Sequence, residues 1–278
     1  MTADRSTPIA LTLAGSDPSG GAGIQADLKT FSALGVYGAS VITALTAQNT
    51  RGVTGVFAIP ADFITLEIDT LATDLSVTAA KTGMLGDEAT VLAVAAGIER
   101  HGIAPLVVDP VMVATSGDLL LAPSAIAAVK ARLIPLATLI TPNLHEAARL
   151  LGSPIAASLD DMERQARDLL ALGAAAVLVK GGHSTGEDAI DVLAMRGVEG
   201  VRRFAAPRIA TRNTHGTGCT LSAAITAELA RATPLEVAIA VGKDYLTGAL
   251  AAGRDLNIGH GAGPVDHLFR LRGARADI

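Results

Sequence analysis

Short apolar segments that alternate with longer segments of helical period are the feature that most constrains the fold of this chain. The short runs are rich in Val, Ile and Leu without polar alternation, which is typical of strands buried on both faces of a parallel sheet. We predict such strands at residues 9–14, 40–45, 78–82, 105–109, 138–141 and 176–180. We predict helices between them at residues 22–34, 62–73, 87–99, 123–133, 143–151 and 159–172. This order predicts an α/β fold with a central, mostly parallel sheet and helices on both faces.

The pattern changes after Lys180. Two short pieces, residues 189–195 and 203–206, are predicted to be antiparallel edge strands. Two long helices are predicted to follow them, at residues 218–230 and 235–253.

The length of the chain fits one large α/β domain, because 278 residues suffice to bury a sizeable core. No repeat, low-complexity tract or linker divides the sequence. We therefore predict a single domain over residues 1–278, with an ordered core from about residue 9 to residue 270. Residues 271–278 are expected to form a frayed tail.

Composition excludes several classes of function. Hydrophobic residues make up 50% of the chain and charged residues 18%, which excludes intrinsic disorder. The net charge is −5 and aromatic residues amount to 3%, so we expect no nucleic acid as a partner. Gly, Pro or a charge interrupts every apolar stretch before the roughly 20 residues of a spanning helix, so we expect no membrane. One cysteine and the lack of a secretory signal in the first residues favour a cytoplasmic protein.

The first glycine-rich loop, residues 15–23, follows the first predicted strand, which is where ligands bind in α/β sheets. Gly15 and Gly20 have the spacing of a P-loop, but the Lys and the Ser or Thr of that motif do not follow. The later glycines match the dinucleotide fingerprint, yet no acidic residue ends the second strand. A tight turn before a helix, without a ligand, remains open.

The second glycine-rich loop, residues 213–220, leads into an Ala- and Leu-rich helix. Gly216, Thr217 and Gly218 would present backbone N–H groups toward one point, which suits a phosphate or a developing negative charge. Cys219 lies in the first helical turn, where the helix dipole favours a thiolate. The alternative for Cys219 is a small buried apolar side chain.

Polar residues at the predicted strand ends could complete a site. Asn143 and Glu146 share a helical face and could hold Mg²⁺ through water, but the same spacing also fits a helix cap. Asp109 adds a second carboxylate at a strand end, and Lys180 adds a cation there. A solvated lysine is the alternative for Lys180.

Taken together, these pieces resemble the ribokinase-like small-molecule kinases, and specifically the bacterial hydroxymethylpyrimidine/phosphomethylpyrimidine kinases of thiamine biosynthesis. The resemblance runs from about Ile9 to Phe269, and its motifs occur in the order of the family. These motifs are AGSDPSGGAGIQADLK (14–29), TALTAQNT (43–50), KTGML (81–85), TPNLHEA (141–147), VKGGH (179–183) and NTHGTGCT (213–220).

The resemblance implies a ribokinase-like fold and the phosphorylation of 4-amino-5-hydroxymethyl-2-methylpyrimidine, first to the monophosphate and then to the diphosphate. ATP is the implied co-substrate, with Mg²⁺. Cys219 matches the position of the catalytic base, and the amides from Gly216 to Cys219 would stabilise the transferring phosphoryl group. Lys180 would neutralise nucleotide phosphate charge, while Asp109 and Glu146 would organise Mg²⁺.

Substrate residues are implied in the same way. Gln48 matches the pyrimidine-binding glutamine of the family, since an amide offers a donor and an acceptor side by side. Met84 matches a residue that lies against the ring, and Gly15 and Asp17 match the first-loop side of the pocket. Lys243 matches a late lysine near the phosphates, although a surface helix lysine fits equally.

Two other functions remain open from the sequence. Related pyridoxal or pyridoxine kinases share the cysteine loop and phosphorylate another ring-borne hydroxymethyl group; the Asp17-Pro18-Ser19 version of the first loop favours the pyrimidine. A non-catalytic sensor of a thiamine precursor is the third candidate. The family also suggests a homodimer.

Overall fold

The structure is a computed structural model that describes residues 7–113, 120, 122–182 and 186–272 of the chain. His183 and residues 273–278 of the expected tail lie outside the described residues. Leu271 and Arg272 are described, and they end the short helix α9 (Phe269–Arg272) rather than fraying.

Eight strands form the central sheet, in the order β10-β9-β8-β7-β6-β5-β1-β2. The six strands β2, β1, β5, β6, β7 and β8 pair in parallel with their neighbours in this order. At the other edge, β9 is antiparallel to β8 and β10 is antiparallel to β9. The mostly parallel sheet and the antiparallel pairing at its edge are therefore confirmed. The bounds are β1 Ile9–Ala14, β2 Tyr37–Ile42, β5 Ala79–Thr82, β6 Leu106–Val108, β7 Leu139–Ile140, β8 Ala176–Lys180, β9 Asp188–Met195 and β10 Arg202–Pro207.

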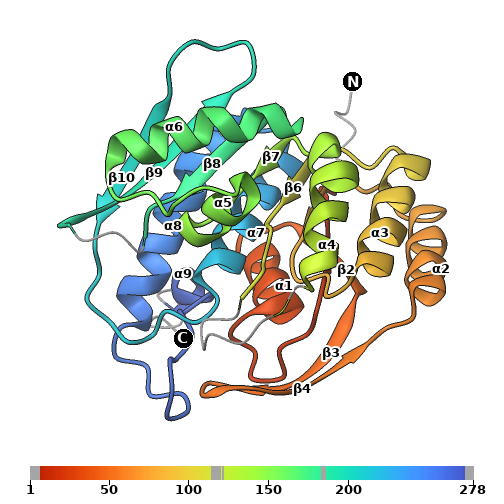
Figure 1. Cartoon of the computed structure of the whole chain (residues 1–278). Helices are drawn as coiled ribbons and strands as arrows, with labels where there is room; N and C mark the ends of the chain where they lie inside the picture. Colours follow the sequence, from red (N-terminus) through yellow and green to blue (C-terminus); the bar gives the residue numbers. More distant parts are fainter. Residues whose placement is uncertain (1–6, 114–119, 121, 183–185, 273–278) are drawn as a thin grey trace, which may run out of the picture.

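Helices cover both faces of the sheet, as predicted (Figure 1). One apolar cluster packs the first face against α2 Ala61–Ala72, α3 Glu88–His101, α4 Pro123–Ala128, α5 Leu144–Leu151 and α6 Leu159–Leu169. A second cluster packs the other face against α1 Gly23–Ala33, α7 Thr217–Ala230 and α8 Leu235–Gly253. Short helical turns extend two of these helices. η1 Val129–Leu133 and η2 Ile134–Leu136 follow α4 and lead to β7, and η3 Leu170–Leu172 follows α6.

Burial explains why the short runs become strands. Every residue of β5 and β6 is buried, because helices lie on both sides of these central strands. Phe31 and Tyr245 fill the second apolar cluster, and Ile68 fills the first; all three side chains are fully buried.

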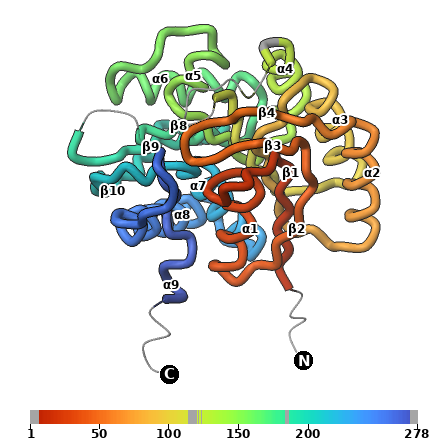
Figure 2. The backbone as a smooth tube through the Cα atoms, turned by 90° about the horizontal axis from the view of Figure 1, so that it is seen from below, coloured from red at the N-terminus to blue at the C-terminus, as the bar shows by residue number. Residues whose placement is uncertain are grey.

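The predicted strand at residues 40–45 is wrong in its bounds. The sheet strand β2 ends at Ile42, and the chain then forms a separate hairpin of β3 (Ala44–Asn49) and β4 (Gly52–Ala58). The hairpin escaped prediction because it lies outside the core: most of β4 is exposed, so the continuous apolar run of a buried strand is absent. It crosses the lower side of the molecule, which faces the viewer in Figure 2.

Candidate active site

The N-terminus of α7 lies directly over two charged side chains from the ends of sheet strands. Lys180 ends β8 and Asp109 follows β6. A Cβ placed on Gly218 would lie 3.3 Å from Lys180 Nζ and 3.7 Å from Asp109 Oδ2, so a glycine lets the helix approach this closely. The structure thus brings together three of the predicted site residues.

Lys180 and Asp109 form an ion pair. Lys180 Nζ donates to Asp109 Oδ1 at 2.8 Å, and the hydroxyls of Thr141 and Ser222 also donate to this carboxylate. Burial opposes the charge of Lys180, but the carboxylates of Asp109 and Glu146 outweigh it and raise the pKa of Lys180 to about 12. Lys180 is therefore a fixed cation at the sheet edge and not a solvated surface lysine.

Glu146 takes part in the cap of helix α5. Asn143 is the N-cap of α5: its side chain accepts from the Glu146 N–H, and Glu146 Oε2 accepts from the Asn143 N–H at 2.7 Å. The capping alternative is therefore confirmed. Burial raises the pKa of Glu146 to about 7, with Lys180 opposing the rise and Asp109 adding to it.

The two glycine-rich loops pack backbone against backbone. Gly216 has a φ of 79°, and a Cβ there would overlap the carbonyl of Gly21. Only a glycine allows both the left-handed conformation and this contact. On the other side of the first loop, Gly15 N–H donates to Met84 O at 3.1 Å, and the Met84 side chain lies against Gly15.

Asp17 organises the first loop. Its carboxylate accepts hydrogen bonds from the backbone of Ser19, Gly21 and Ala22, and from His215 Nε2 at 2.8 Å. These bonds hold the pKa of Asp17 well below its usual range although burial opposes this. Asp17 therefore fixes the conformation of the first loop.

Gln48 joins this group from the hairpin. Its Nε2 lies 3.5 Å from His215 Nε2, and its Oε1 accepts from Thr46 at 3.3 Å. The four predicted substrate residues Gly15, Asp17, Gln48 and Met84 are thus neighbours around the first loop.

Cys219 corrects one expectation. The side chain is partly exposed in the first turn of α7. Burial of its surroundings raises the pKa of Cys219 to about 11, so the group is a thiol at neutral pH and not the thiolate expected from the helix dipole. Lys81 and the Gly23 N–H favour the thiolate, whereas Asp27 and Asp109 oppose it.

The side chain of Lys243 is buried inside the protein. It belongs to α8, is 7% exposed, and its Nζ lies 2.6 Å from Asp191 Oδ2. Asp191 Oδ1 in turn accepts from the Gly181 N–H. Lys243 is therefore a buried ion-pair partner beneath the loop after β8, which excludes the surface-lysine alternative.

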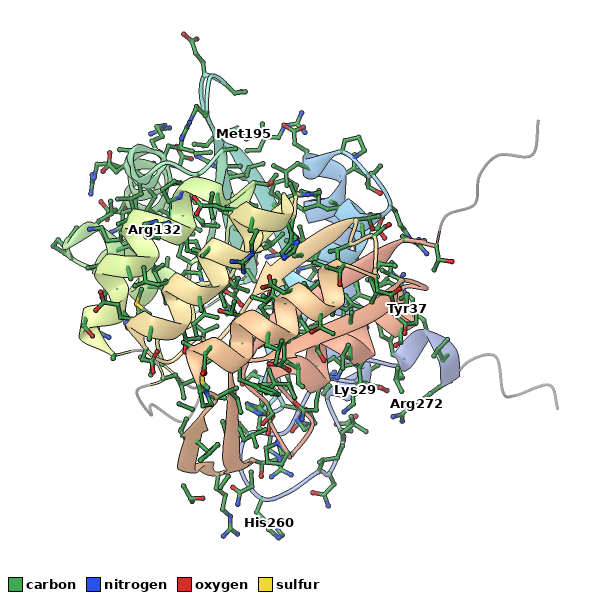
Figure 3. All side chains as sticks on the ribbon, turned by 90° about the vertical axis from the view of Figure 1, so that its right-hand side faces the viewer. Lys29, Tyr37, Arg132, Met195, His260 and Arg272 are labelled. Carbon is green, nitrogen blue, oxygen red and sulfur yellow. The ribbon has the colours of Figure 1, made fainter. Side chains whose placement is uncertain are left out.

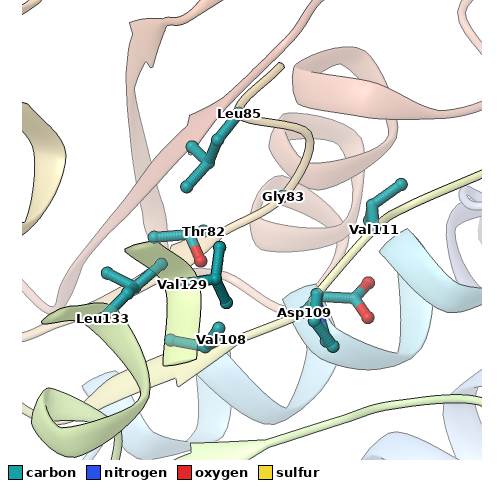
Figure 4. A pocket seen from close by; sticks show the side chains of 9 residues that line it. Thr82, Gly83, Leu85, Val108, Asp109, Val111, Val129 and Leu133 are labelled. Atoms are coloured by element: carbon teal, nitrogen blue, oxygen red, sulfur yellow. The ribbon is translucent and has the colours of Figure 1, made fainter. Parts of the chain in front are cut away.

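A cavity lies beside Asp109 (Figure 4). Its wall is mainly apolar and is completed by Thr82, whose buried hydroxyl has no partner among the described residues. The lining residues are Thr82, Gly83, Leu85, Val108, Asp109, Pro110, Val111, Val129 and Leu133.

A family model described as phosphomethylpyrimidine kinase matches residues 17–266. The chain belongs to this family. A hydroxymethylpyrimidine/phosphomethylpyrimidine kinase of Rhizobium meliloti is 56% identical over 266 residues, which are 95% of this chain and 98% of that one. An Escherichia coli protein of the same name is 54% identical over 259 residues, which are 93% and 97% of the two chains.

A solved structure shares the fold. The ADP complex of Bacillus subtilis pyridoxal kinase superposes with a TM-score of 0.87 at 38% identity, and the match covers 96% of this chain and 100% of that one. The phosphomethylpyrimidine kinase family and the ribokinase-like fold that the ordered motifs predicted are therefore confirmed.

The donor set of this family member fits a magnesium ion. Asp109 and Glu146 offer carboxylate oxygens, which Mg²⁺ prefers, and it is commonly held by one or two carboxylates together with substrate phosphates. Burial raises the pKa of Glu146, and the carboxylate of Asp109 adds to the rise. A divalent cation beside these carboxylates would oppose that rise.

Sequence reasoning missed two groups of this kinase-family site. His215 stands within the NTHGTGCT motif, but its contact with Asp17 spans 198 residues of sequence. Lys81 on β5 and Asp27 on α1 form a fully buried ion pair. A lysine inside a short apolar strand and an aspartate on an apolar helix face are the signals that could have found this pair.

Among the described ranges, no helix is both long and apolar enough to cross a membrane.

Proposed function

We propose that this protein transfers the γ-phosphoryl group of ATP to the hydroxymethyl group of 4-amino-5-hydroxymethyl-2-methylpyrimidine, and then phosphorylates the monophosphate to the diphosphate used in thiamine biosynthesis. The observation that carries this proposal is the contact between the two glycine loops, in a chain of the phosphomethylpyrimidine kinase family. The contact sets the Gln48 and Met84 side of the site beside the N-terminus of α7, which carries Cys219.

The reaction needs a base for the hydroxyl proton and hydrogen-bond donors for the negative charge of the transferring phosphoryl group. With a pKa of about 11, Cys219 is mainly a thiol at neutral pH, so its minor thiolate form is the base. It accepts the proton of the attacking hydroxyl: the O–H bond breaks, an S–H bond forms, and the oxygen takes the phosphoryl group from ATP, which leaves as ADP. The N–H groups at Gly216, Gly218 and Cys219 stabilise the transferring group, because the first N–H groups of a helix lack partners within it. The Thr217 N–H donates to the Thr214 carbonyl at 3.3 Å and would have to leave it to join them.

The nucleotide side of the site uses the charged residues at the strand ends. Lys180 balances phosphate charge, as the similarity to a pyridoxal kinase solved with ADP supports. Asp109 and Glu146 would hold Mg²⁺, which supplies charge neutralisation to the phosphates. Lys243 supports the loop after Lys180 through Asp191.

A second candidate is pyridoxine or pyridoxal phosphorylation, favoured by the TM-score of 0.87 to a pyridoxal kinase. A mass-resolved time course with MgATP distinguishes the two. We expect successive mono- and diphosphates from the pyrimidine and little product from pyridoxine. Phosphorylation of pyridoxine alone would overturn the proposed substrate, and binding of the pyrimidine without ADP production would favour a sensor.

Replacing Cys219 tests the base. We expect Cys219→Ala to lower turnover by about 10²–10⁴, the usual size of a lost general base, with a modest change in KM. Steady-state kinetics against wild type measure both. Near-normal turnover would remove Cys219 from this role and leave the helix amides as the main source of catalysis.

The assembly and compartment complete the proposal. We propose a homodimer that uses the hairpin, because Leu45, Val56 and Phe57 expose apolar side chains there. We also propose the cytoplasm as the compartment, which agrees with a free thiol at the active site.

A further inference from the structure

The side chain of His215 connects the two glycine-rich loops. Its Nε2 lies 2.8 Å from Asp17 Oδ2, and both side chains are buried. The Asp17 carboxylate is ionised and can only accept hydrogen bonds, so Nε2 carries the hydrogen of this bond. The bond therefore joins the loop that follows β1 to the loop that leads into α7, across 198 residues of sequence.

The bond reaches the first loop at an atom that also holds the backbone of that loop. Asp17 Oδ2 accepts from the N–H groups of Gly21 and Ala22, at 3.1 Å and 2.8 Å. The edge of the imidazole lies against Gly21, because a Cβ on this glycine would come within 2.5 Å of His215 Cδ2. The imidazole is thus held by a hydrogen bond and by contact with the same turn of backbone.

The backbone of His215 is fixed by a later part of the chain. Its N–H donates to the carbonyl of Gly263 at 3.0 Å, and His215 forms a parallel bridge with Pro264. The next residue, Gly216, is the N-cap of α7 and lies against the carbonyl of Gly21. The position of His215 therefore determines where α7 begins relative to the first loop.

The two sides of the proposed reaction meet at this histidine. Gln48 Nε2, on the pyrimidine side, lies 3.5 Å from His215 Nε2, and Cys219 follows in the first turn of α7. Transfer needs the attacking oxygen, the base and the phosphoryl group in alignment, and a displacement of about 1 Å can lower a rate about a hundredfold. Without His215, Asp17 would still keep its hydrogen bonds within the first loop, so alignment would suffer more than binding of the ring.

We propose that His215 is a positioning residue of the reaction: the hydrogen bond from its Nε2 to Asp17 sets the distance between the pyrimidine side of the site and the helix terminus that carries Cys219. In this role His215 transfers no proton itself. The inference rests on the proposed phosphoryl transfer and adds to it the residue that aligns its two sides.

Two substitutions separate the hydrogen bond from the space that the imidazole fills. Glutamine carries an N–H donor the same number of bonds from Cβ as Nε2 of histidine, whereas methionine is of similar size and has no donor. We expect His215→Met to lower kcat by about tenfold to a hundredfold, with little change in KM for the pyrimidine. His215→Gln should keep most of the wild-type kcat. Steady-state kinetics of the full chain with MgATP measure both parameters.

Hydrogen exchange of the first loop follows the bond in the absence of substrates. Backbone N–H groups exchange faster where local structure opens more easily. We expect residues 15–23 to exchange faster in His215→Met than in wild type, and at a rate close to wild type in His215→Gln. A side chain that only fills space would not produce this difference between the two variants.

His267→Met is the matched control. His267 is also buried, and its Nε2 lies 3.1 Å from the hydroxyl of Thr220 on the same helix α7. This substitution disturbs the packing of α7 but leaves the bond between His215 and Asp17 in place. We expect kcat and the exchange of residues 15–23 to stay close to wild type. An equal fall of kcat in both methionine variants would overturn the inference.

The remaining outcomes distinguish the inference from the proposed function. If His215→Met fails to fold, His215→Asn replaces it, because its amide ends one bond closer to the backbone than Nε2 does. A folded variant that lacks the bond and keeps the wild-type kcat would overturn the inference. If the wild-type protein yields no phosphorylated pyrimidine, the proposed function is wrong, and unchanged exchange in the variants would still exclude His215 as the link between the loops.

Discussion

Single side chains in this protein act through partners that are distant in the sequence. Gln48 lies on the hairpin, yet its neighbour His215 belongs to the loop before α7 and is itself held by Asp17. The imidazole therefore connects the pyrimidine side of the proposed site with the loop that carries the base. The Thr46 hydroxyl donates to Gln48 Oε1 at 3.3 Å, which restricts the positions that the Gln48 amide can take.

We expect Gln48→Leu to weaken pyrimidine binding by about tenfold to a hundredfold, because a lost buried pairing costs about 1–3 kcal/mol. Nucleotide binding should be unchanged, which provides an internal control in the same protein. Titration calorimetry with each ligand measures both affinities. An unaltered pyrimidine affinity would contradict the assignment of Gln48.

At the scale of elements, the β3–β4 hairpin stands apart from the main sheet. Leu45 and Phe57 are cross-strand partners, and their side chains are 45% and 66% exposed. Exposed apolar side chains on a projecting hairpin are typical of an interface between copies. The hairpin lies at the end of the molecule where His260 is labelled in Figure 3. The N–H of Gly261, the next residue, donates to the hydroxyl of Thr50 in the turn of the hairpin.

We expect the wild-type protein to sediment as a dimer and Phe57→Asp to sediment as a monomer, because a buried charge would oppose the interface. Tyr37→Ser is the matched control: Tyr37 is 58% exposed and lies away from the hairpin (Figure 3), so this variant should remain dimeric. Analytical ultracentrifugation gives the mass. A wild-type monomer, or a dimeric Phe57→Asp, would exclude the hairpin interface.

At the scale of the whole molecule, charged side chains gather where the parallel strands end. Lys81 lies near the end of β5, Asp109 follows β6 and Lys180 ends β8. Parallel strands end at the same edge of a sheet, so residues far apart in the sequence become neighbours there. Several buried charged groups therefore lie close together. Because folding changes the pKa values of such groups, the free energy of unfolding depends on pH.

Glu146 gives a signed prediction for this link. Its pKa rises from 4.5 to about 7 on folding, so the folded state holds an extra proton between these values. The contribution of Glu146 to the free energy of unfolding therefore falls as the pH rises through that window. We expect Glu146→Gln, which can keep the capping geometry, to lose less stability than wild type between pH 5 and pH 8.

Urea unfolding of both proteins without Mg²⁺ at the two pH values measures the difference. Equal losses of stability in wild type and Glu146→Gln would show that the carboxyl is ionised in both states across this range.

The sequence by itself determined the features that depend on local order. The buried strands, the helices between them, the two glycine loops and the cap at Asn143 follow from periodicity and residue type, and the order of the motifs determined the family. Only the tertiary structure decided the hairpin, the protonation state of Cys219, and the partners of Asp17 and Lys81. These features depend on burial and on contacts between residues that are 54 to 198 positions apart in the sequence. The free energy of an ionised side chain is set by the groups that fold around it rather than by its neighbours in the chain.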